Sequence, residues 1–297
     1  MRNSIKAEIK TFVKMKSIWV CITALIVFSA LLFNQSYDTA INESTVLHAV
    51  MDELYNLAGD DGDIDTSYIE EVALDIYKTY HPKMSINNAT GLLIGLGLIF
   101  FPIASSLYMG IEYSRNKAIK YKITHSTLIK TFISKCIVIS IFAVATVLLY
   151  SSISYILALI RWKTLHELLL QIDFVNYNSV SLYTFKNNLL LLVLVSSILI
   201  FYSVISMLVS AFMKSGTYGV ISVIAINYIV IPSSYSPHNV IFSLINRVVY
   251  TSPISPYEFK QSGTVALAPE VDVAFFVGYL LFVTAVLLFL GKVQKNN

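Results

Sequence analysis

The stretch CIVISIFAVATVLLYSSISYILALI occupies residues 136–160 and contains no Asp, Glu, Lys or Arg. A helix needs about 20 mainly apolar residues to cross the roughly 30 Å of hydrocarbon in a bilayer, and this stretch is long enough to do so. A charge at the bilayer centre costs at least a few kcal/mol, so a long uncharged run is typical of a membrane-spanning helix. We therefore expect residues 136–160 to cross a membrane.

Five further stretches are similarly apolar, and they bring the candidate spans to six. They are Ser17–Phe33, Gly91–Met109, Asn188–Leu208, Tyr218–Ile231 and Val271–Leu290. The candidate at 218–231 is short unless residues 215–217 extend it. Only 13% of all residues are charged and 56% are hydrophobic, whereas a soluble domain has about 25% charged residues. The composition excludes an ordinary soluble protein and predicts an all-α integral membrane protein with six transmembrane helices.

The charges between these stretches alternate in sign along the chain. Residues 1–16 carry five basic side chains and one acid, residues 34–88 carry eleven acids and two lysines, and residues 110–135 carry six basic side chains and one acid. If the N-terminus is cytoplasmic, 14 of the 21 Lys and Arg residues lie on the cytoplasmic side. Cytoplasmic loops are rich in Lys and Arg, so this pattern predicts a multi-pass protein of a plasma membrane with both termini in the cytoplasm.

Three of the polar segments that flank or join these spans have patterns of their own. Residues 1–16 have apolar and basic side chains at helical spacing, which predicts an interfacial amphipathic helix or, equally, a basic anchor that fixes orientation. Residues 34–88 are expected to form a small acidic cap of two helices. Within the cap, residues 59–65 do not fit EF-hand spacing, which favours a solvated acidic turn over a calcium site. The proline-containing segment 232–270 is expected to form a re-entrant or interfacial segment before the sixth span. Residues 17–297 would together form one six-span transmembrane domain.

The basic segment 110–135 is too apolar for a solvated loop. Its apolar residues recur at helical spacing, and they are Ile119, Ile123, Leu128, Ile129, Phe132 and Ile133. We expect one or two short helices packed on the cytoplasmic surface, where they would be able to dock a soluble partner. A basic loop that faces only the lipid is the alternative.

The sequence lacks the motifs of several enzyme classes. It contains no phosphate-binding Gly-x-x-x-x-Gly-Lys-Ser/Thr motif and no zinc-protease motif, and its five histidines show no metal-ligand spacing. The candidate spans carry no acid–base pair of the kind expected in a proton-coupled carrier. We therefore expect this chain to have no catalytic residue, no metal site and no cofactor of its own, so the energy for any transport must come from another subunit.

Polar residues within the candidate spans are more often packing features than ligand contacts. Asn227 and Tyr228 are the most polar pair in the middle of a span, and they are the best candidates for side chains that line a transport pathway. Ser105 and Ser106 are weaker candidates of the same kind.

The segment between the second and third spans resembles a known family. Glu112 and Tyr113 close the second span, a basic stretch follows, then a turn that contains Ser126, and then a lysine that opens the third span. This motif resembles that of the permease subunits of ABC-type exporters of the type-2 class. The overall order of elements is also similar to that family, with an N-terminal interfacial helix, a large outer loop, a tight turn at 214–216 and a re-entrant segment.

This resemblance implies that residues 110–135 form a coupling loop. The coupling residues that it implies are Glu112, Arg115, Lys117, Lys120, Lys122, His125 and Ser126. Relatives often have Gly-Thr and Ser-Arg where this chain has Lys117-Ala118 and Ser126-Thr127, so the motif is loose. The implied partners are an ATP-binding cassette ATPase subunit that binds ATP and Mg²⁺, a second permease subunit in a homodimer or heterodimer, and membrane lipid. Nucleic acid is not expected as a partner.

The expected function is ATP-driven export of an amphipathic substrate, with an antimicrobial or toxin peptide favoured and a lipid or drug as the alternative. The richness in Asn, Lys, Ile and Tyr indicates a low-GC bacterium of the Gram-positive kind. An alternative of another class is a membrane sensor or scaffold whose outer cap binds a ligand.

Overall fold

The computed structural model describes residues 2–58, 66–114, 128–182 and 184–229, together with a few positions between 240 and 285, chiefly 273–279. The elements in the first four of these ranges are helices, and no strand occurs in the described part of the chain. They are α1 (Arg2–Val13), α2 (Lys16–Ala58), α3 (Ser67–Tyr80), the short 3-10 helix η2 (Pro82–Met84), α4 (Ser85–Ser114), α6 (Leu128–Leu169), the 3-10 helix η3 (Tyr177–Ser179), α7 (Phe185–Met213) and α8 (Gly216–Ile229).

Four of these helices are long and apolar enough to cross a membrane. They are α2, α4, α6 and α7, and they contain the first four predicted spans. The prediction of an all-helical fold is therefore confirmed for the described residues, and four apolar helices of spanning length support a membrane protein. The fifth predicted span begins in α8, which is described as far as Ile229. The sixth span lies largely outside the described residues, and so do the acidic turn at 59–65 and the re-entrant segment before the sixth span.

Helices α2 and α6 are each about twice as long as a bilayer crossing requires. They contain 43 and 42 residues, and at about 1.5 Å per residue each exceeds 60 Å, against roughly 30 Å of hydrocarbon. The first of the two helices expected in the acidic cap is therefore a continuation of the helix that contains the first span. Helix α6 likewise continues beyond residue 160, the end of the third predicted span, as far as Leu169. Neither helix contains a Gly or Pro that would end it earlier.

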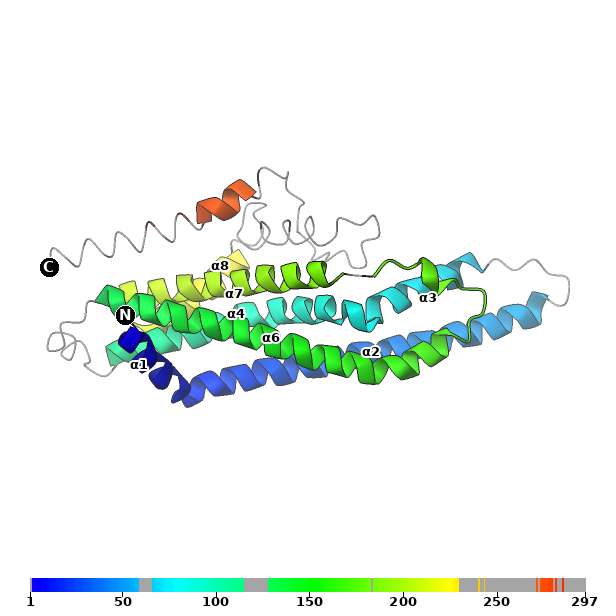
Figure 1. Ribbon diagram of the computed structural model, residues 1–297, viewed down its shortest axis with the longest axis horizontal. Helices are drawn as coiled ribbons and strands as arrows, with labels where there is room; N and C mark the ends of the chain where they lie inside the picture. The colour runs from blue at the N-terminus through cyan, green and yellow to red at the C-terminus, as the bar shows by residue number, and fades with distance from the viewer. Residues whose placement is uncertain are drawn as a thin grey trace.

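The long helices α2, α4, α6 and α7 run roughly along the long axis of an elongated bundle, and α1 lies at a steep angle to them (Figure 1). Helix α4 is central and contacts α2, α6, α7 and α8. Helix α1 packs on α6 at one end, here called the α1 end, and α3 packs on α2 and α6 at the opposite end, the α3 end (Figure 1). The turn from α7 to α8 and the helix ends that flank residues 115–127 all lie at the α1 end (Figure 1).

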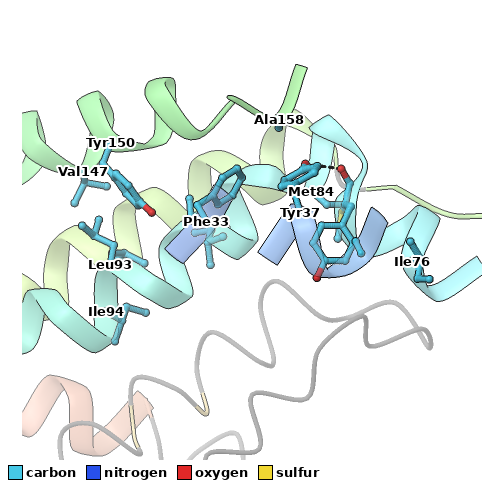
Figure 2. Close-up of a cluster of buried hydrophobic side chains, with 14 of the residues drawn as sticks. Phe33, Tyr37, Ile76, Met84, Leu93, Ile94, Val147, Tyr150 and Ala158 are labelled. Atoms are coloured by element: carbon cyan, nitrogen blue, oxygen red, sulfur yellow. Dashed lines mark hydrogen bonds between the residues drawn. The ribbon is translucent and has the colours of Figure 1, made fainter. Parts of the chain in front are cut away.

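Buried aromatic and aliphatic side chains hold the α3 half of the bundle together. Figure 2 shows Phe33 and Tyr37 from α2 packed among side chains of α3, α4 and α6. The Tyr37 hydroxyl is fully buried and donates a hydrogen bond of 2.6 Å to the backbone oxygen of Tyr80. An unpaired hydroxyl in this place would cost about 1–3 kcal/mol, so the bond holds the C-terminal end of α3 against α2.

Candidate functional site

The predicted coupling segment, residues 110–135, includes the last turn of α4 and the first turns of α6, and residues 115–127 between them lie outside the described residues. Glu112 lies in the last turn of α4, and its side chain is outside the described residues. The remaining predicted coupling residues, Arg115, Lys117, Lys120, Lys122, His125 and Ser126, also lie outside the described residues. The backbone of Asn227 and Tyr228 belongs to α8, but their side chains fall outside the description as well. The structure therefore describes the two helix ends to which the coupling segment is attached.

A buried ion pair joins α1 to these two helix ends. The Lys135 Nζ of α6 lies 3.0 Å from the Glu8 Oε2 of α1, and the Lys135 side chain is fully buried while that of Glu8 is 14% exposed. The Tyr108 hydroxyl of α4 donates a hydrogen bond of 2.7 Å to the same Glu8 oxygen. The Lys135 ammonium also lies 3.6 Å from the centre of the Tyr108 ring. We call Glu8, Tyr108 and Lys135 the Glu8 node.

The Glu8 node depends on the amphipathic face of α1. Phe12 lies one helical turn after Glu8, is 2% exposed, and packs edge-on against Tyr108 and Phe142. Ile9 and Val13, which the sequence places on the same apolar face as Phe12, remain 41% and 52% exposed. One side of α1 therefore packs on the bundle while the other leaves apolar side chains on the surface, as expected for a helix at a membrane interface.

The Glu8 node is a positioning device rather than a reactive site. Burying two opposite charges is costly unless they are paired and hydrogen-bonded, and here each charge has the other together with Tyr108. The two charges are paired in this arrangement of the helices, and other arrangements would leave a buried charge without a partner. The Glu8 node therefore fixes how α1, α4 and α6 pack against one another.

Small residues allow α4, α7 and α8 to approach closely at the same end. A Cβ built on Gly110 would lie 2.9 Å from the Cα of Gly216, so the backbones of α4 and α8 are nearly in contact. The turn between α7 and α8 is short, as predicted, and Lys214 adopts a left-handed conformation there with φ of 50°. Its backbone N–H donates to the oxygen of Ser210, which closes the end of α7.

The two weaker pathway candidates lie in or beside this junction. Ser106 is fully buried, lies 2.7 Å from the Ser210 hydroxyl as a hydrogen-bonded pair, and donates to the backbone oxygen of Gly216. Ser105 is also fully buried and donates a hydrogen bond of 3.0 Å to the oxygen of Pro102 in its own helix. Both hydroxyls are thus occupied in contacts within and between helices.

Aromatic and histidine side chains gather at the α3 end. Trp162 of α6 lies in ring contact with His81 and stacks on His166, with ring centres 4.9 and 5.2 Å apart. Tyr77 of α3 contacts the same three rings and also Tyr177. The Nδ1 atom of His81 accepts a hydrogen bond of 3.1 Å from the backbone N–H of Lys83. Among the described residues, no three His, Cys, Asp or Glu side chains are placed to hold a metal ion.

The α3 end is expected to open more readily in acid. Burial, followed by the charges of Lys83 and His166, lowers the pKa of His81 to about 4 from 6.5. Between these two pH values the unfolded chain binds a proton that the folded chain excludes, so stability falls as the pH is lowered from 6.5 towards 4. Protonation of Nδ1 would also remove the acceptor for the Lys83 N–H.

Hydrogen exchange at the α3 amides, corrected for the intrinsic pH dependence, checks this prediction. We expect severalfold less protection at pH 4.5 than at pH 7, and a smaller difference in a His81→Gln variant. Amides of α7 in the same sample provide the internal control. An unchanged pH difference in His81→Gln would show that another group is responsible.

No protein family, curated protein or solved structure matches the chain. Sequence reasoning missed the Glu8 node, although one signal was present: Glu8 is the single acid of residues 1–16, among five basic side chains. A lone acid beside the apolar face of a basic helix suggests a buried cationic partner, but the sequence does not say which cation.

Proposed function

We propose that this chain is the permease subunit of an ATP-driven exporter in a bacterial plasma membrane, with the α1 end in the cytoplasm. A separate ATP-binding cassette ATPase subunit docks on residues 110–135 and supplies both ATP binding and Mg²⁺. A second permease subunit completes the pathway. The substrate is an amphipathic molecule, with an antimicrobial or toxin peptide favoured, and Asn227 and Tyr228 are the proposed lining residues.

The Glu8 node is the observation that carries this proposal. A permease without its own ATPase needs a rigid connection between the docked ATPase and the spans. Helices α4 and α6, which flank the basic segment 115–127, are joined to each other and to α1 by Glu8, Tyr108 and Lys135. Movement of the docked segment would therefore be passed to the second and third spans together.

The charge of the two ends supports the proposed orientation. Of the described Lys and Arg residues, eight lie at the α1 end and five lie towards the α3 end. The eight are Arg2, Lys6, Lys10, Lys14, Lys16, Lys130, Lys135 and Lys214, and the five are Lys78, Lys83, Arg161, Lys163 and Lys186. Nine described acids lie towards the α3 end, against Glu8 and Glu112 at the α1 end. Positive charge is concentrated on the cytoplasmic side of membrane proteins, so the α1 end is assigned to the cytoplasm.

Charge reversal in the docking segment tests the proposal. A tagged chain purified from its native membrane is expected to bring down an ATP-binding subunit, identified by mass spectrometry. The double variant Lys117→Glu/Lys120→Glu is expected to reduce the amount of recovered ATP-binding subunit at least about tenfold. The new glutamates would face the acidic groups of the subunit that the lysines attract, and like charges placed together across an interface cost several kcal/mol. The variant Lys214→Glu, which changes a cytoplasmic charge outside the segment, is the matched control. If the wild-type chain never recovers an ATP-binding subunit, the exporter proposal fails.

A membrane sensor or scaffold is the second candidate, and the length of α2 and α6 favours it. Both helices continue well beyond a bilayer crossing and carry α3 and the aromatic cluster at their ends. A projecting helical unit of this kind is suited to binding an external ligand. The same purification separates the two candidates, because a sensor needs no ATP-binding subunit.

A further inference from the structure

A groove of about 780 Å³ lies between α6, α7 and the start of α4, towards the α3 end. Its volume is within the range of ligand pockets in proteins, about 300–1,000 Å³. The walls are mainly apolar, with Leu148 and Ile156 from α6 facing Leu189 and Leu192 from α7.

The groove faces the region where lipid would lie. Both of its long walls belong to candidate membrane spans, α6 and α7. Ile156 and Leu189 are 55% and 51% exposed although they are apolar, and Phe185 at the start of α7 is 82% exposed. Apolar side chains so exposed in spanning helices are covered by acyl chains, and the nearby Tyr155 is a residue type enriched at the membrane–water interface.

The groove also contains one charged side chain and two buried polar atoms without hydrogen-bond partners. Of the lining residues, all in the described part of the chain, Lys83 alone carries a charge. The Asn188 Oδ1 is buried and accepts no hydrogen bond, while its Nδ2 donates to the backbone oxygen of Lys83 at 3.2 Å. The Ser151 hydroxyl, in a residue 4% exposed, also lacks a partner. Buried polar atoms normally have hydrogen-bond partners, so both atoms are open to a hydrogen bond with the polar groups of a ligand.

We propose that the groove binds one phospholipid with an anionic headgroup. An acyl chain lies between the apolar residues of α6 and α7, the phosphate lies beside Lys83, and a hydroxyl of the glycerol or headgroup donates to Asn188 Oδ1. The cation at the polar end and the apolar walls match the two ends of such a lipid. The inference rests on the groove alone and holds whether the chain is a permease or a sensor.

Native mass spectrometry of the purified chain in detergent, titrated with phosphatidylglycerol, tests the headgroup contact. We expect one retained lipid per chain and, in Lys83→Gln, an affinity about fivefold lower, the usual effect of one lysine at an anionic surface. The matched control is Lys186→Gln, which removes an exposed lysine at the start of α7 that does not line the groove. Equal losses in the two variants would overturn the proposal in favour of general attraction to anionic lipid. Competition by glycerol phosphate at the lipid's own concentration would also overturn it, because the acyl chain would then contribute nothing.

Filling the groove tests the acyl-chain contact. Leu189 and Val193 lie one turn apart on α7 and are similarly exposed, at 51% and 55%, but only Leu189 is among the groove-lining residues. Leu189→Trp is expected to lose the retained phosphatidylglycerol, whereas Val193→Trp is expected to keep it. Retention by both variants, or loss from both with unchanged helicity in circular dichroism, would refute the assigned place of the lipid. Lys83→Gln keeps the test decisive if a tryptophan variant does not fold.

Discussion

Replacing Lys135 with methionine is expected to destabilise the bundle by about 3–5 kcal/mol, the usual cost of removing one partner from a buried ion pair. Lys135 is fully buried, and its loss would leave the Glu8 carboxylate in a largely apolar site with Tyr108 as its remaining described partner. The effect should centre on the α1 end, because α1 would lose its ionic contact with α6. Thermal unfolding in detergent measures the loss of stability, and hydrogen exchange at the α1 amides measures where it occurs.

Two further variants make the Lys135 experiment specific. Lys163→Met changes an exposed lysine on the same helix, α6, and is expected to change stability by less than about 1 kcal/mol. The double variant Glu8→Gln/Lys135→Met removes both charges and should recover much of the lost stability, since no charge is left buried without a partner. If the double variant is no more stable than Lys135→Met, the unpaired Glu8 charge is not the cause.

Gly219→Ala is expected to produce the second large effect, a destabilisation of about 1–3 kcal/mol or more from overpacking. A Cβ at this position of α8 would lie under 3.0 Å from the hydroxyls of Ser106 and Ser210 and 2.5 Å from the backbone oxygen of Ser206. The hydroxyls belong to an occupied hydrogen-bond network and the Ser206 oxygen belongs to α7. The added methyl group of alanine can therefore fit only if α7 and α8 move apart.

Gly95→Ala is the matched control for Gly219→Ala. Gly95 also lies within a helix, α4, but a Cβ built there meets nothing within 4 Å. Alanine is preferred to glycine inside a helix by about 0.5–1 kcal/mol, so this variant should unfold at a slightly higher temperature than the wild type. Thermal unfolding of the two variants in the same detergent compares them. Equal changes in the unfolding temperature of the two variants would show that the close approach of α4, α7 and α8 does not exclude a larger side chain at position 219.

Secondary structure was predicted best from the sequence where the residues of a segment decide it by themselves. Residues 136–160 lie within a spanning-length helix because their own apolar character and the absence of Gly and Pro favour one, whatever surrounds them. The same reasoning, applied further along, would have shown that α2 continues to Ala58 and α6 to Leu169. The change from apolar to polar composition at residue 34 suggested a boundary, but polar residues without a helix breaker simply continue the helix outside the hydrocarbon.

The sequence by itself therefore determined the four apolar helices of spanning length and the charge difference between the two ends of the bundle. The tertiary structure alone decided that Glu8 meets Lys135 and Tyr108, that Ser106 is held at a junction of three helices, and that a groove opens between α6 and α7. Apolar length and charge sign are properties of a segment, whereas each of these contacts depends on which faces of helices distant in the chain are turned towards each other. That choice is made by the packing of all the helices together, and it is not encoded in the spacing of any one of them.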